Sequence, residues 1–211
     1  VMVHSNVDFT KTFLMLKGKV GSGSMAYTVS FMLLPEKPMP ARLQDSRIGV
    51  FPVGPGEGSV KYDLSSAEDG FRGYLLASRW RLELSDTTAW QNGQKVTVKN
   101  PIVWYVDNSF PEAWKTPIKN GVLAWNHAFE AIGLKDVMQV RDFPTVEEDP
   151  RFDPDNLKYS CIRYVPDATM NAMGPSWVDP VTGEILNASV LVYNDVIKLI
   201  NNWRFVQTSQ V

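Results

Sequence analysis

The sequence predicts an α+β fold, in which one long amphipathic helix packs on a mixed β-sheet. The first observation is a β-prone run at Ile102–Val106, followed by a helical pattern and a second β-prone run at Val137–Val140. Strand, helix and strand of these lengths are typical of a βαβ unit. The second is a set of further β-prone runs on either side of this unit. The third is composition: 44% hydrophobic and 21% charged residues exclude disordered, collagenous and coiled-coil proteins.

The helix is expected over about residues 117–132. Thr116 is a suitable N-cap, and Pro117 suits the first helical position because its ring fixes a helical φ. Gly133 is placed where a left-handed residue ends a helix, and Gly121 predicts a close approach of the helix to the sheet. The apolar residues then recur at steps of four and three along one stripe: Ile118, Val122, Trp125, Phe129 and Ile132.

The region before this unit predicts a β-hairpin over residues 7–34. Its strands are the runs Phe9–Leu16 and Tyr27–Leu34, and the glycine-rich segment Gly18–Ser24 is expected to form the turn. Prolines and glycines then crowd residues 35–59, which marks an organisational boundary. We therefore expect a hairpin and connector over residues 1–58, the tail of a preceding domain, and a second unit over residues 59–211.

The second unit contains several further predicted elements. Arg79–Leu84 alternates strictly, as in a half-exposed strand, and an acidic, proline-containing loop is expected over residues 144–157. Asp179 and Gly183 predict a tight hairpin turn, with an Asx turn at the first and a positive φ at the second. The remaining expectations are a strand at residues 160–165, a hairpin over 177–186, a strand at 189–193 and a helix from Val196.

Charge and residue counts exclude several functions. The net charge of −2 gives no basic field for nucleic acid, and no apolar stretch approaches the ~20 residues of a membrane span. Two histidines and one cysteine exclude an internal disulfide, a cysteine-rich zinc cluster and a three-histidine metal site. Seven tryptophans instead predict a large aromatic core or aromatic-lined grooves.

The candidate chemical groups favour structural roles. Cys161 lies in a strand-like run and is expected to be a buried thiol, while His127 is expected on the exposed side of its helix and His4 in a frayed terminus. The carboxylate pairs Asp179 with Glu184 and Asp107 with Glu112 could serve glycosidase chemistry but are better explained as turn and capping residues. Within the acidic loop, residues 147–155 favour a solvated loop over a calcium site.

Several longer motifs resemble one family: large secreted bacterial zinc-dependent metalloproteases of the metzincin type. The segment that opens the catalytic domain of that family is similar to Pro101–Asn108, Pro111–Trp114 and Gly121–Gly133, and the family's next signature is similar to Gly174–Leu186. Upstream, the end of the domain of unknown function that precedes it is similar to Leu34–Met39 and Asp45–Phe51.

The resemblance implies a strand, a long helix, a strand and then an antiparallel edge strand above the cleft. Peptide substrates add to that edge through main-chain hydrogen bonds. The segment carried over as the edge strand, or as its neighbour, consists of Ser189, Val190, Leu191, Val192 and Tyr193. The resemblance also implies a secreted, periplasmic or cell-surface location, and a peptide or protein as substrate.

The metal motif of the family is absent. Such enzymes bind zinc through H-E-x-x-H-x-x-G-x-x-H, with the glutamate as general base on zinc-bound water, and neither His4 nor His127 has this spacing. We therefore expect a piece of a zinc metallopeptidase that is inactive alone, with zinc bound elsewhere in the natural protein. Loss of the zinc helix would expose apolar surface, which predicts self-association or disorder over residues 194–211.

Two other functions remain open. The first is a non-catalytic, aromatic-rich β module that binds carbohydrate or protein, and the second is a degenerate peptidase that serves as a scaffold. Aromatic exposure separates the first from the peptidase hypothesis. Buried Trp104, Trp125 and Trp203 would place the aromatic surplus in the core, whereas a row of exposed tryptophans at 80, 90 and 114 would favour the module.

Overall fold

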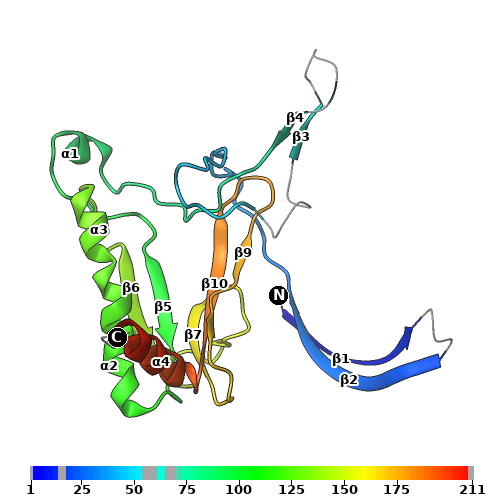
Figure 1. Ribbon diagram of the computed structural model, residues 1–211. Coiled ribbons are helices and arrows are strands. Elements are labelled where there is room, and N and C mark those ends of the chain that lie inside the picture. The colour runs from blue at the N-terminus through cyan, green and yellow to red at the C-terminus, as the bar shows by residue number, and fades with distance from the viewer. Residues whose placement is uncertain (1, 14–17, 54–60, 65–69, 71, 209–211) are drawn as a thin grey trace.

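A computed structural model describes residues 2–13, 18–53, 61–64, 70 and 72–208. Its centre is a six-stranded mixed sheet in the order β6-β5-β7-β10-β8, with β9 also paired to β10 (Figure 1). The predicted α+β class is therefore confirmed. The strands are β5 (Ile102–Val106), β6 (Met138–Asp142), β7 (Ser160–Val165), β8 (Ala172–Met173), β9 (Ser176–Val178) and β10 (Ile185–Tyr193).

Parallel and antiparallel pairs occupy different parts of this sheet. β5 pairs in parallel with β6 and β7, and β7 pairs in parallel with β10. β8 and β9 pair antiparallel with the other side of β10. The predicted βαβ unit is confirmed, because helix α2 (Glu112–Ala124) and helix α3 (Asn126–Ala131) connect the neighbouring parallel strands β5 and β6.

The predicted bounds of the long helix, 117–132, are wrong at the start and miss an interruption. The helix begins five residues earlier with Pro111 as N-cap, so that Pro117 lies inside it and Thr116 is not a cap. The helix is interrupted at Trp125, although the backbone of this residue stays in the right-handed helical region (φ −61°, ψ −22°). The two helices therefore follow one another almost as one rod (Figure 1).

The apolar stripe of this rod is only partly buried. Ile118, Val122 and Phe129 pack against the core, but Trp125 is 63% exposed and Ile132 is also exposed. A Cβ atom at Gly121 would meet nothing within 4 Å, so the predicted close approach to the sheet is wrong. Gly133 does have the predicted positive φ, 82°, and ends the helix.

Both faces of the central strand β5 are covered, as its continuous apolar run predicted. On one face Trp104 and Val106 join the core beneath the helices. On the other face Tyr105 contacts Phe152 and Tyr159, with ring centroids 5.4 and 5.3 Å apart. Phe152 belongs to the acidic loop, which forms turns without regular structure, as predicted.

The amino-terminal hairpin is confirmed, but its turn is placed differently. β1 (Met2–Phe13) pairs antiparallel with β2 (Gly18–Ser30), so Gly18–Ser24 lie within a strand rather than in the turn. Glycine is compatible with extended backbone as well as with turns, so the glycines of this segment did not mark the turn. Leu14 and Leu16 of the predicted first strand lie outside the described residues. The hairpin projects away from the central sheet (Figure 1).

The segment between hairpin and sheet has little regular structure. It contains the short pair β3 (Lys61–Asp63) and β4 (Arg72–Tyr74) and the helix α1 (Thr87–Gln91). The predicted strand at Arg79–Leu84 is wrong, because only isolated bridges form, from Arg79 to Glu184 and from Leu84 to Val98. Its alternation reflects the packing of Trp80, Leu82 and Leu84 against the core, without a neighbouring strand to complete a ladder.

The tryptophans fit neither simple expectation about their exposure. Trp104 is buried and contacts Trp80 edge-on, and Trp114 also packs against the core. Trp125 and Trp203 are exposed, at 63% and 59%. Part of the aromatic surplus therefore forms the core and part lies on the surface.

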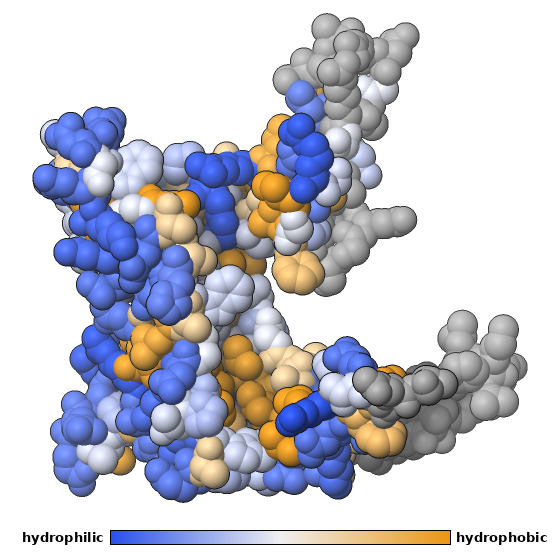
Figure 2. All heavy atoms as spheres, turned by 60° about the vertical axis from the view of Figure 1, so that its left-hand side comes forward, coloured by the Kyte–Doolittle hydropathy of each residue, from blue (hydrophilic) through white to orange (hydrophobic). Residues whose placement is uncertain are grey.

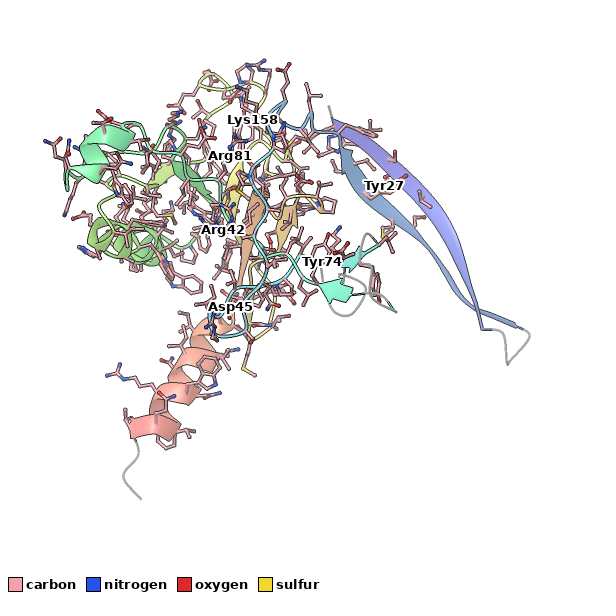
Figure 3. All side chains as sticks on the ribbon, turned by 90° about the horizontal axis from the view of Figure 1, so that it is seen from above. Tyr27, Arg42, Asp45, Tyr74, Arg81 and Lys158 are labelled. Carbon is pink, nitrogen blue, oxygen red and sulfur yellow. The ribbon has the colours of Figure 1, made fainter. Side chains whose placement is uncertain are left out.

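The last predicted helix is confirmed as α4 (Val196–Thr208), which extends from the end of β10 and projects from the molecule (Figure 3). None of its residues is buried. Its apolar side chains at Ile197, Ile200, Trp203 and Val206 are exposed and recur at steps of three. The predicted self-association of residues 194–211 stays a prediction, with this apolar stripe as its structural basis.

Candidate peptide-binding edge

The antiparallel segments β8 and β9 form the outer side of the sheet next to β10. Met173 lies opposite Leu191, and Trp177 lies opposite Asn187. The backbone N–H of Tyr193 donates to Asn171 at 3.4 Å, and that of Ser189 donates to Pro175 at 2.9 Å. The odd-numbered residues from 171 to 177 therefore direct their main-chain groups at β10.

The even-numbered residues direct theirs outward. Gly174 and Ser176 present their main-chain N–H and C=O on the side away from β10, and residues 171–177 are all exposed. At Ala172 the outward N–H already donates to the side chain of Asn171 at 2.8 Å. We name the stretch Asn171–Trp177 the outer edge. It can accept another extended chain through its main chain.

The five residues predicted as the edge strand, or as its neighbour, lie next to this edge. Ser189–Tyr193 pair in parallel with Cys161–Val165 of β7, and Leu191 and Val192 also pair with β8. Their side chains alternate between the faces of the sheet. Val190 and Val192 lie on the face that carries α2, and Ser189 lies on the opposite face with Asn187.

An apolar groove lies on the α2 face. It has a volume of about 300 Å³ and is bordered by α2 and β10. Figure 2 shows apolar side chains gathered in the hollow at the middle of the molecule, with polar side chains around it. The groove is lined by Trp104, Ile118, Val122, Trp125, Ile162, Val190 and Val192, with Gly121 and Met138.

The candidate carboxylates have the turn and capping roles that the sequence favoured. Asp179 is buried, and its carboxylate accepts from the Val181 N–H at 2.9 Å and from the Thr182 hydroxyl at 2.6 Å. Burial raises the pKa of Glu184, whose carboxylate lies 3.8 Å from Arg81.

The second pair is also structural. Asp107 accepts from the Ser109 N–H at 2.8 Å and the Tyr164 N–H at 3.2 Å, and so joins β5 to β7. Glu112 lies in the first turn of α2 and forms an exposed ion pair with Lys115.

The residues suited to nucleophilic or metal chemistry do not converge. His4 lies on β1, His127 lies exposed on α3, and Cys161 is fully buried in β7. Burial raises the pKa of the Cys161 thiol to about 12, which keeps it protonated and unreactive at neutral pH. In the described part of the chain no three His, Cys, Asp or Glu side chains gather as metal ligands. The residues present therefore do not fit a zinc site.

Within the outer edge only Trp177 was predicted as part of a strand, in the hairpin over residues 177–186. Prolines at positions 166 and 175 argue against a regular strand between them, because proline cannot donate to a ladder. Proline is, however, compatible with an edge strand, and Pro175 contributes its carbonyl to the pairing with β10. The sequence signal for this edge strand was the pair Gly174 and Pro175, which comes immediately before the β-prone residues 176–178.

Comparison with known proteins gives one match. Residues 3–85 match the family described as a domain of unknown function (DUF5117). No curated protein and no solved structure matches the chain. Among the described helices none is long and apolar enough to cross a membrane. Residues 3–85 are thus similar to a domain without an assigned function, and the central sheet with its outer edge lies outside that match.

Proposed function

We propose that this chain supplies the substrate-binding sheet of a secreted, periplasmic or cell-surface zinc metallopeptidase. In this proposal a peptide or protein substrate adds to the outer edge as a further antiparallel strand. The zinc ligands are provided by sequence outside these 211 residues, because the described residues hold no ligand cluster and the H-E-x-x-H motif is absent from the sequence. The chain alone is therefore inactive in peptide hydrolysis.

The observation that carries the proposal is the outer edge. It is the antiparallel side of an otherwise parallel sheet, and it is exposed from Asn171 to Trp177. Main-chain groups at Gly174 and Ser176 give affinity that is independent of substrate sequence, and neighbouring side chains give selectivity. The order β5, α2 with α3, and β6 matches the strand, long helix and strand that the family resemblance implies, and the parallel strand β7 then precedes the antiparallel segments.

The apolar groove gives separate support. It leaves part of β7 and β10 uncovered on the helix face, where Val190 and Val192 line it. A parallel sheet normally has helices over both faces. We place a further helix of the natural protein in this groove, and the zinc motif of the resembling family lies on such a helix.

The test is hydrolysis of a denatured protein, such as unfolded casein, by the natural protein that contains this sequence. We expect activity that is lost in chelator and restored by zinc, and no activity from residues 1–211 alone. A natural protein whose activity is insensitive to chelator contradicts the proposal. A natural protein without H-E-x-x-H and without activity would instead support the degenerate scaffold.

A further inference from the structure

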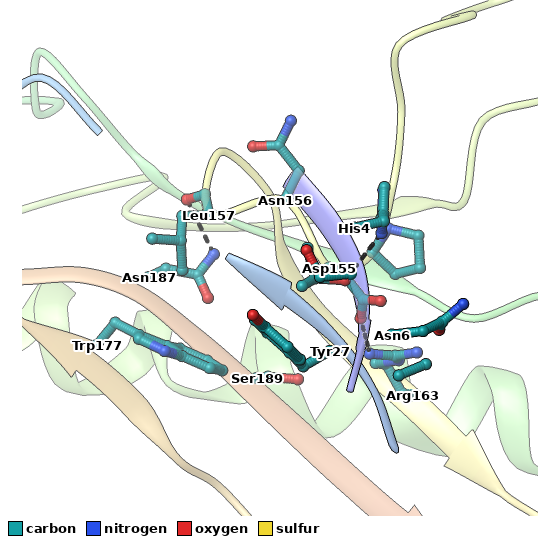
Figure 4. A pocket seen from close by; sticks show the side chains of 14 residues that line it. His4, Asn6, Tyr27, Asp155, Asn156, Leu157, Arg163, Trp177, Asn187 and Ser189 are labelled. Carbon is teal, nitrogen blue, oxygen red and sulfur yellow. Dashed lines mark hydrogen bonds and ion pairs between the residues drawn. The ribbon is translucent and has the colours of Figure 1, made fainter. Parts of the chain in front are cut away.

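A separate cavity lies on the opposite face of the sheet, between the β1–β2 hairpin and the strands. Its volume of about 560 Å³ is within the usual range of small-molecule sites. The hairpin contributes residues 4–6 and 26–28, and the acidic loop contributes residues 154–157. The wall on the sheet side comes from Arg163, Trp177, Asn187 and Ser189 (Figure 4).

Two nearly buried polar side chains form the floor of this cavity. Asn187 is 3% exposed, and its amide nitrogen donates to the carbonyls of Leu157 and Tyr159 at 3.1 and 2.8 Å. Its carbonyl oxygen has no partner in the described part of the chain. Ser189 is 8% exposed, and its hydroxyl likewise has none there. Both residues line the cavity, and neither oxygen is among the fully buried unpartnered atoms of the described residues, so a ligand in the cavity can reach both as hydrogen-bond partners.

Two aromatic side chains line the cavity from different elements. Tyr27 comes from the hairpin and is 40% exposed, and Trp177 comes from the outer edge and is 45% exposed. In the view of Figure 4 the Tyr27 ring lies between Trp177 and the Asp155–Arg163 pair. An aromatic ring offers a flat apolar face, and the Tyr27 hydroxyl adds a donor and an acceptor.

The charged groups of the cavity are compensated within the protein. Arg163 forms an ion pair with Asp155 at 2.6 Å, and His4 lies 3.8 Å from Asp153 at the rim. The cavity therefore has no unpaired arginine for a phosphate or carboxylate. Its floor is also too polar for an aliphatic ligand, because an apolar group there would leave both oxygens unpaired.

From this arrangement we propose that the cavity binds a neutral saccharide unit. A sugar ring has one apolar face that can stack on Trp177 or Tyr27. Its hydroxyl groups can donate to Asn187 Oδ1 and exchange hydrogen bonds with Ser189 Oγ. The proposal does not depend on the peptidase function. It uses the side chain of Trp177 rather than the outward main-chain groups at Gly174 and Ser176, and it requires no metal.

The experiment is saturation-transfer difference NMR on the full chain with glucose, galactose, mannose and N-acetylglucosamine, each added separately. We expect saturable binding of at least one sugar. Ser189→Ala removes a hydroxyl without a protein partner and is expected to weaken binding about fivefold. Trp177→Ala removes the stacking surface and is expected to weaken binding about tenfold.

Trp125→Ala is the matched control, because Trp125 is also exposed but lines the groove on the α2 face. Sugar binding by this variant is expected to equal that of the wild type. The proposal is overturned if no sugar binds saturably, or if Trp177→Ala and Trp125→Ala bind equally well. It is also overturned if acetyl-asparagine amide, a peptide mimic, binds at this cavity and no sugar does.

Discussion

Gly183 illustrates how one residue fixes the turn before β10. Its φ is +77°, and a Cβ atom there would lie 2.2 Å from the carbonyl oxygen of Ala77. Only glycine tolerates both the left-handed backbone and this approach. The turn thereby joins β9 and β10 to the segment that precedes Arg79, whose N–H donates to the Gly183 carbonyl at 2.9 Å.

Gly183→Ala is expected to lower the free energy of unfolding by about 3 kcal/mol, because backbone strain adds to a steric clash. Gly93→Ala is the control, since Gly93 has the same φ of +77° with nothing within 4 Å of a Cβ atom. Its cost is expected to be about 1 kcal/mol, from backbone strain alone. Urea unfolding of both variants measures the difference, and equal losses would contradict the clash at Ala77.

Cys161 gives a pH-dependent prediction at the same scale. Burial raises the pKa of its thiol from 9.0 to about 12, so above pH 9 the unfolded chain loses a proton that the folded chain keeps. The contribution of the thiol to stability is therefore complete below pH 9 and decreases as the pH rises toward 12. We expect the difference in free energy of unfolding between wild type and Cys161→Ala, measured by urea unfolding, to change with pH only above pH 9. A difference that changes between pH 6 and 8 would contradict this account.

At the scale of elements, the side chain of Asn126 joins the rod formed by α2 and α3 to the main chain of β6. Asn126 accepts from the Met138 N–H at 2.8 Å, and its amide donates to the Met138 carbonyl at 3.0 Å. The side chain thus occupies main-chain groups on the outer side of β6 that would otherwise be exposed.

Asn126→Ala is expected to destabilise the chain by about 2 kcal/mol, through the loss of two hydrogen bonds to the backbone. Asn120→Ala is the matched control, because Asn120 is exposed on α2. That variant is expected to be unchanged or slightly more stable, since alanine favours helix. Thermal unfolding compares the two, and a similar midpoint for both would show that the Asn126 contact contributes nothing.

Sequence patterns were sufficient for the elements with strong local signals. The continuous apolar run predicted β5, and Asp179 with Gly183 predicted the turn before β10. The hairpin predicted over residues 177–186 is confirmed by the antiparallel pairing of β9 with β10. Patterns failed where tertiary contacts decide: the alternation at Arg79–Leu84 arises from packing against the core, and the short segment β8 is defined by its register with β10. The outer edge could not be located from sequence because long-range pairing determines which main-chain groups remain free.

At the scale of the whole molecule, the sheet is covered unequally. The acidic loop and hairpin residues 4–6 and 26–28 lie over one face, whereas the helix face retains the apolar groove. The projecting helix α4 carries a further exposed apolar stripe. Contiguous exposed apolar surface favours association with another surface. In a solution of this chain alone, the partner available to this apolar surface is a second copy of the chain.

We therefore expect concentration-dependent dimerisation of residues 1–211 in sedimentation velocity. Trp203→Asp introduces a charge into the α4 stripe and is expected to weaken the dimer at least tenfold, about 1.4 kcal/mol or more. Val146→Asp is the control, because Val146 is 76% exposed but belongs to the acidic loop on the other face. A wild-type chain that stays monomeric at high concentration would contradict this expectation.

Peptide addition to the outer edge can be measured most directly by NMR on the ¹⁵N-labelled chain, with a short soluble peptide of alternating threonine and lysine as probe. We predict downfield shifts of the Gly174 and Ser176 amide protons as they donate to the added strand. The Ala172 amide is the internal control and is predicted to stay unchanged, because it already donates to Asn171. Unchanged amides at Gly174 and Ser176, or shifts confined to β6 at the opposite side of the sheet, would contradict the proposed substrate-binding edge.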